Sequence, residues 1–122
     1  MESAVLMVLL TLQTGSGLAV SFAETDDRPA CEERMGRVQA ILRLAPDVSV
    51  VDSGCYPSNA RFEPFDHAPP ADTPHRHYLV VLDEGAAVIE LQKDATACAV
   101  ALGNVSEGSR RYCASSYQGR ID

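Results

Sequence analysis

Tryptophan is absent from this 122-residue chain, and phenylalanine and tyrosine bring the aromatic content to only 6%. Basic residues are also scarce, because 10 lysines and arginines stand against 17 acidic residues, for a formal net charge of −7. A protein that binds nucleic acid needs a basic face, so this balance excludes general nucleic-acid binding. No apolar run is as long as the roughly eighteen residues of a membrane helix, which excludes a multi-span membrane protein.

Several short motifs that carry chemistry are missing as well. No two cysteines form a C-x-x-C pair, which argues against a zinc ribbon and against a thioredoxin-type redox site. No G-x-S-x-G sequence is present, so the chain lacks the nucleophile turn of many hydrolases. The sequence therefore gives little support to an enzyme, and a small secreted hydrolase is only a secondary alternative.

The first 23 residues have the layout of a secretory signal. Residues 4–23 contain no charged side chain, and the apolar run from Ala4 to Leu12 is too short to span a bilayer. Small residues at Ser21 and Ala23 suit signal peptidase, and charged residues begin at Glu24. We therefore predict a signal peptide over residues 1–23, with no stable membrane span after its cleavage. An uncleaved anchor and a buried amino-terminal helix are the alternatives.

All four cysteines follow this segment: Cys31, Cys55, Cys98 and Cys113. An even number of cysteines in a short exported chain is typical of a disulfide framework. Three pairings are possible, and we favour Cys31–Cys55 with Cys98–Cys113 because each closes a local unit. Four free thiols in a cytosolic protein are the alternative, which requires the signal prediction to fail too.

The remaining residues, 24–122, predict one small α+β domain. Apolar residues recur at three- and four-residue steps over residues 28–44, which indicates an amphipathic helix. Strands are expected at 48–52, 77–82, 86–91 and 110–113, while residues 97–102 suit a strand or a helix. We see no internal repeat, and the polar tail from Ala114 is expected to fray. The predicted fold is a signal segment, then one helix packed on a three- to four-stranded antiparallel sheet, with disulfides as staples.

A proline-rich loop at 57–76 interrupts this pattern. Five of the seven prolines lie between residues 57 and 74, where they block helix and central strand. Tyr56, Phe62 and Phe65 accompany them, and aromatic side chains dominate many binding interfaces. These three residues are therefore the predicted partner-binding surface. In the alternative interpretation, the two phenylalanines cover the open face of the sheet and belong to the core.

The three histidines fall within eleven residues, as His67, His75 and His77. In an extended segment, the imidazoles of an H-x-H pair point to the same side and can share one Zn²⁺ or Cu²⁺ ion. His67 could supply a third ligand from the loop. In the alternative interpretation, the same residues form a solvated polar loop that leads into a strand, and they bind no metal.

Taken together, these patterns predict a small exported protein, periplasmic or secreted, that contains disulfides and acts as a binding or accessory protein. Its partner is expected to be another protein. A metal-binding protein that uses His75 and His77 is the first alternative. No catalytic residue is predicted, and no cofactor is implied beyond the possible metal ion.

Overall fold

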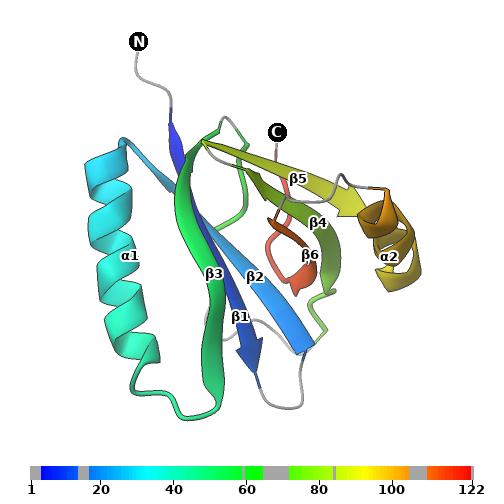
Figure 1. The fold of residues 1–122 in the computed structure, drawn as a ribbon, viewed down its shortest axis with the longest axis horizontal. Coiled ribbons are helices and arrows are strands. Elements are labelled where there is room, and N and C mark those ends of the chain that lie inside the picture. Colours follow the sequence, from blue (N-terminus) through cyan, green and yellow to red (C-terminus); the bar gives the residue numbers. More distant parts are fainter. Residues whose placement is uncertain are drawn as a thin grey trace.

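The computed structural model describes residues 4–13, 17–58, 60–64, 72–83, 85–104 and 110–121. It contains six strands and two helices in the order β1 (Val5–Gln13), β2 (Gly17–Thr25), α1 (Arg28–Leu42), β3 (Val48–Pro57), β4 (Arg76–Asp83), β5 (Ala86–Gln92), α2 (Ala95–Gly103) and β6 (Arg110–Ser116). All six strands form one mixed sheet in the order β3-β1-β2-β6-β4-β5. Figure 1 shows α1 beside β1 and β3, and α2 at the opposite end of the molecule.

The predicted fold class is wrong in the size of its sheet and the number of its helices. The sheet has six strands and is mixed, because β2 and β6 run parallel to each other. Residues 95–103, which contain the alanine-rich run 97–102, form a second helix instead of a strand. The expected helix over residues 28–44 is confirmed as α1, and the hairpin of residues 77–91 is confirmed as β4 and β5.

The extra strands come from the segment that the sequence analysis assigned to a signal. β1 lies inside the sheet, paired antiparallel with β2 on one side and with β3 on the other. Its side chains alternate between two hydrophobic clusters, so both of its faces are buried. The sequence of a strand that is buried on both faces is a continuous apolar run. Such a run has the same composition as the apolar core of a signal peptide. Cleavage after Ala23 remains a prediction, and it would remove β1 and most of β2.

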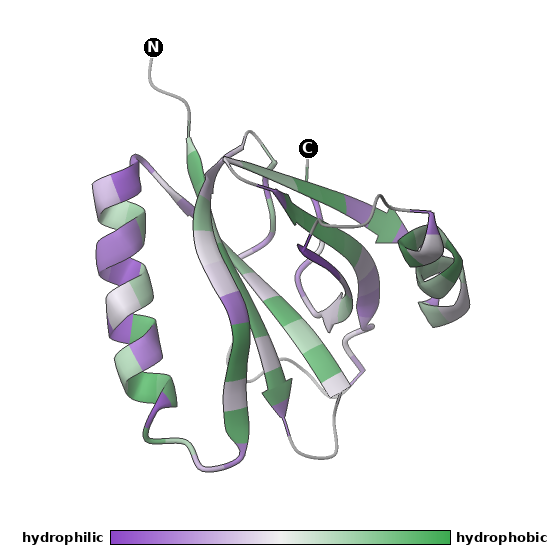
Figure 2. Ribbon diagram, viewed as in Figure 1, coloured by the Kyte–Doolittle hydropathy of each residue, from purple (hydrophilic) through white to green (hydrophobic). Residues whose placement is uncertain are grey.

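The two clusters lie on opposite faces of β1. Leu6, Val8 and Leu10 join the larger cluster, which also contains residues of β2, β4 and β5. Val5 and Met7 belong to the smaller cluster, which packs under Cys31 and Met35 of α1. Figure 2 shows the hydrophobic colour along β1 and the mixed colouring of α1, which buries one face only.

The chain contains a structural repeat that the sequence analysis missed. The order β1-β2-α1-β3 recurs as β4-β5-α2-β6, and in each unit the first strand pairs antiparallel with the second and the third. Each helix begins after an aspartate, Asp27 or Asp94, whose side chain accepts a hydrogen bond from the backbone N–H three residues later. A cysteine follows each aspartate by four residues. The short motif D-x-x-x-C is the one clear sequence trace of the repeat.

Both favoured disulfides are confirmed, and they occupy equivalent positions in the two units. Cys31–Cys55 joins α1 to β3, and Cys98–Cys113 joins α2 to β6, each with a Cα–Cα distance of 6.0 Å. Each bond therefore ties the helix of a unit to the third strand of that unit. Equivalent positions in the two units can be found by counting from the capping aspartates or from these cysteines.

The two units meet at two junctions that differ in strand pairing. At the first junction, β2 and β6 pair in parallel at Ala19 and Ser115. At the second, β5 and β3 approach each other but stay at opposite edges of the sheet order. The positions equivalent to Ala19 and Ser115 are Ala86 and Pro57. We call this second junction, which is unpaired in the described sheet, the seam. Pro57 has no backbone N–H to donate there.

The carboxyl-terminal tail is fixed, contrary to the sequence expectation. The buried Gln118 side chain accepts a hydrogen bond from the Phe22 N–H and donates to the carbonyl oxygens of Phe22 and Glu63. Tyr78 donates its hydroxyl hydrogen to the Gln118 carbonyl at 2.7 Å. These bonds satisfy buried polar groups that would otherwise destabilise the core, so the tail is part of the folded domain.

Candidate functional site

The seam contains a cavity that is lined by residues of both units. This cavity has a volume of about 540 Å³ and lies between α1, β3, the turn from β4 to β5, and the start of β6. Its charged lining residues are Arg28 and Glu32 on α1, Asp83 on β4, and Arg110 on β6. A concave site with a few convergent polar groups is the usual form of a ligand-binding site.

Arg110 is fixed at the seam by two residues of β3. Its guanidinium donates to the Asp52 carboxylate at 2.9 Å and to the Tyr56 hydroxyl at 2.6 Å. Tyr112 donates to the other carboxylate oxygen of Asp52 at 2.7 Å. The Asp52 side chain is only 10% exposed, whereas that of Arg110 is 49% exposed. The buried carboxylate thus holds one end of a guanidinium that still faces solvent.

Asp52 and Arg110 occupy equivalent positions, each three residues before the disulfide cysteine of its unit. Two equivalent residues contact each other only near the axis that relates their units, as in a twofold dimer. The ion pair therefore marks the approximate twofold axis between the units. An acidic residue in one unit and a basic residue in the other make this contact attractive, where identical residues would repel.

Gly54 leaves room for the Tyr56 ring. A Cβ atom at position 54 would lie 2.6 Å from the Cε2 and Oη atoms of Tyr56. Such a distance is shorter than real carbon contacts, so any side chain there would displace the ring. The glycine therefore helps to place the Tyr56 hydroxyl against Arg110.

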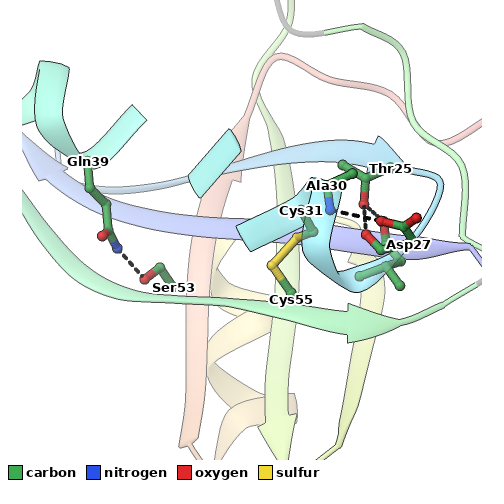
Figure 3. Close-up of a disulfide and its surroundings, with 8 residues drawn as sticks. Thr25, Asp27, Ala30, Cys31, Gln39, Ser53 and Cys55 are labelled. Atoms are coloured by element: carbon green, nitrogen blue, oxygen red, sulfur yellow. Dashed lines mark hydrogen bonds between the residues drawn. A yellow bond between two sulfur atoms is a disulfide. The ribbon is translucent and has the colours of Figure 1, made fainter. Parts of the chain in front are cut away.

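Two links tie α1 to β3, and Figure 3 shows both of them. One is the Cys31–Cys55 disulfide, and the other is a hydrogen bond of 3.0 Å from the Gln39 amide to the Ser53 hydroxyl. Gln39 also lines a second cavity of about 350 Å³, together with Leu42, Arg43, Val48 and Val50. Both cavities lie between α1 and β3 and share Gln39 in their linings, and we call the two together the α1–β3 cleft.

The predicted partner-binding residues lie mainly in the core. Tyr56 is 5% exposed and Phe62 is 4% exposed. The Phe62 ring stacks on Phe22 with a centroid distance of 3.9 Å, and its edge contacts Tyr78. Phe65 lies outside the described residues. For Phe62, the structure thus matches the alternative interpretation, in which the ring covers the face of the sheet.

The histidines are placed without a metal-binding group around them. His75 contacts Tyr117 edge to face with a centroid distance of 4.1 Å, and His77 lies in β4. Among the described residues, no group of three or more histidine, cysteine, aspartate or glutamate side chains is arranged to hold a metal ion. His67 lies outside the described residues, so a site that includes it remains a prediction.

The hydroxyl of Tyr112 titrates differently from a free tyrosine. Burial raises the pKa of Tyr112 above its ordinary value of 10.0, and the hydrogen bond to Asp52 and the charge of that carboxylate raise it further. Burial also raises the pKa of Tyr78, despite opposing effects of Arg76 and Arg120. In both cases the folded protein favours the neutral phenol.

These shifts predict a loss of stability at alkaline pH. The folded chain keeps the two protons to a higher pH than the unfolded chain, so their contribution is complete below about pH 10 and falls as the pH rises through the folded-state pKa values. The variant with both Tyr78→Phe and Tyr112→Phe should therefore lose less of its free energy of unfolding between about pH 9 and about pH 11 than the original protein. Urea unfolding across this range measures the difference, and parallel pH profiles would contradict the assignment.

Sequence reasoning missed the residues that build the seam. The sequence analysis ended one predicted strand at Asp52 and began another at Arg110, but it did not pair the two residues. Only the D-x-x-x-C repeat, which aligns the two units and places these residues at equivalent positions, could have brought them together. Compared with family models, with curated proteins and with solved structures, the chain gives no match.

Neither of the two described helices combines the length and the apolar content that crossing a membrane requires. The molecule is therefore a small disulfide-containing protein, in which two ββαβ units together form one six-stranded sheet.

Proposed function

We propose that this chain is an exported binding or accessory protein, periplasmic or secreted, which contacts another protein through the α1–β3 cleft at the seam. Two disulfides support export, because such bonds persist in oxidising compartments and are rare in the cytosol. The proposal concerns the chain with residues 1–23 in place, because β1 pairs with β3 beside the cleft. The acidic net charge of −7 favours a partner with a basic surface.

The observation that carries this proposal is the fixed Arg110 beside an open cavity. Most polar side chains on a protein surface lose conformational freedom when they bind, and that loss weakens the complex. Arg110 is already held by Asp52 and Tyr56, so much of its ordering is complete before a partner arrives. The Cys31–Cys55 bond likewise fixes α1 against β3. A site built in this way is preorganised for binding.

A photo-crosslinking amino acid at position 36 tests the location of this site. Gly36 lines the cavity, and a Cβ atom there would meet no other atom within 4 Å, so a larger side chain fits without displacing α1. In cells that produce the variant, we expect a discrete crosslinked species in the periplasmic or culture-medium fraction.

Gly103 provides the matched control. It lies at the end of α2 and is not among the lining residues, and a Cβ atom there also meets nothing within 4 Å. Crosslinking at position 103 should not give the same species. Equal crosslinking at both positions, or none at position 36, would contradict the proposal.

A further inference from the structure

The free edge of β3 directs backbone groups away from the sheet. Ser58 donates its N–H to the Ala4 carbonyl, at the end of the ladder between β3 and β1. In an antiparallel ladder, alternate residues bond to the partner strand, so Tyr56 faces β1 whereas Ser53 and Cys55 face away from it. Consistent with this, the Ser53 N–H bonds to the neighbouring Asp52 carboxylate at 2.8 Å. Cys55 therefore presents its N–H and carbonyl at an outer edge.

The α1–β3 cleft runs along this edge. Its two cavities are lined by β3 residues from Val48 to Tyr56, and Gln39 of α1 lines both. At ~3.3 Å per residue, this part of β3 is roughly 26 Å long, which matches an extended segment of about eight residues. A helix that lies beside the free edge of an outer strand is the arrangement in which some peptide-binding domains add a ligand strand.

The charges along the cleft define the kind of segment that fits. At the seam, Asp52 offsets the charge of Arg110, so the other charged residues described in the lining are Glu32, Asp83 and Arg28. The whole chain adds to this acidic potential, because its net charge is −7.

The other end of the cleft has a different character. Leu42, Val48 and Val50 contribute apolar side chains to its lining, beside the polar side chains of Gln39 and Arg43. Val50 keeps 39% of its surface exposed, so apolar area is available to an incoming side chain. Because Cys55 and Val50 are five residues apart on β3, a segment that fits both ends carries a basic side chain at one position and an aliphatic side chain about four to six residues away.

We propose that an extended, basic segment of a partner polypeptide adds to the free edge of β3 as a further strand. The backbone of the segment pairs with Cys55, its lysine or arginine lies near Glu32 and Asp83, and its aliphatic side chain packs against Val50. This inference rests on the proposed function and adds the mode of binding and the chemistry of the partner to it.

A displayed library of random peptides of about twelve residues provides the probe, since a strand that fills the cleft needs about eight. Selection for binding to the whole oxidised protein should enrich peptides in which lysine or arginine lies four to six residues from leucine, isoleucine or valine. Gly36→Trp should abolish their binding, because the indole would occupy the cavity, whereas Gly103→Trp should not change it.

Two further measurements test the charge and the strand pairing. Glu32→Gln should weaken the selected peptides by about tenfold, while the matched variant Glu33→Gln should have no such effect, since Glu33 pairs with Arg37 outside the cavity lining. Exchange of the Cys55 amide hydrogen should slow in the complex, and methylation of alternate peptide nitrogens should abolish binding in one of the two registers.

Each outcome decides a different claim. Peptides that bind Gly36→Trp as well as they bind the original protein would overturn the proposed site. A failure to enrich any peptide would overturn both the proposed site and strand addition as the mode of binding. Peptides that Gly36→Trp excludes, but that tolerate methylation in both registers and leave the Cys55 amide unprotected, would overturn strand addition alone. Equal weakening by Glu32→Gln and Glu33→Gln would overturn the specific contact with a basic side chain.

Discussion

A chain that begins at Glu24 is expected to remain unfolded. The deletion removes β1, which lies between β2 and β3 and is buried on both faces, together with most of β2. The remaining strand β3 would lose β1, its pairing partner among the described strands, and the larger core would lose Leu6, Val8 and Leu10. Circular dichroism and amide NMR dispersion of purified residues 24–122 measure the result. A cooperatively folded product would show instead that the cleavage predicted after Ala23 leaves an intact domain.

Two point variants test the same strand without shortening the chain. Leu10 is fully buried, whereas Leu12 is 47% exposed, so they form a matched pair on one strand. Leu10→Ala should lower the free energy of unfolding by about 3 to 5 kcal/mol, and Leu12→Ala by about 1 kcal/mol or less. Urea unfolding of both variants gives the comparison. Similar small losses for the two would mean that residues 5–13 contribute little to the core.

Removal of both disulfides is expected to have the second large effect. The bonds close loops with sequence separations of 24 and 15 residues. In the chain-entropy model each contributes roughly 3 kcal/mol, so the two together approach the whole stability of many small domains, about 5 to 15 kcal/mol. The variant with all four cysteines changed to alanine should therefore be largely unfolded at 37 °C.

The two double variants separate the contributions of the two units. Cys31→Ala with Cys55→Ala and Cys98→Ala with Cys113→Ala should each remain folded, with losses of roughly 3 kcal/mol. The equivalent placement of the bonds leads us to expect similar losses. If one double variant loses almost nothing, its helix is held to the sheet by packing alone.

Local features of this fold are readable in the sequence, because they depend on neighbouring residues. The apolar spacing over residues 28–44 predicted α1, which begins after the capping Asp27. The strands predicted at 77–82 and 86–91 form the hairpin of β4 and β5, where Gly85 adopts a positive φ of 79°. The cysteine pairing followed from the preference for local loops, and both bonds are confirmed.

The arrangement of distant segments was harder to read. The apolar run of β1 has the same composition whether it enters a membrane, serves as a signal or lies buried in a sheet, so sequence alone did not separate these outcomes. The aromatic residues Tyr56 and Phe62 suggested a surface, but long-range contacts with Arg110 and Phe22 place them inside the protein. Asp52 and Arg110 are 58 residues apart, and only the fold shows that they meet.

The two unequal junctions bear on how such a protein could arise. A homodimer of one ββαβ unit would have two identical junctions, and any mutation that opened one would open the other. Duplication and fusion of the gene remove this constraint, because each half can then accept substitutions of its own. In this chain, Ser115 keeps a backbone donor at the paired junction, while Pro57 removes it at the seam. The proposed binding site thus lies at the junction where the two units differ in the backbone donor that they present.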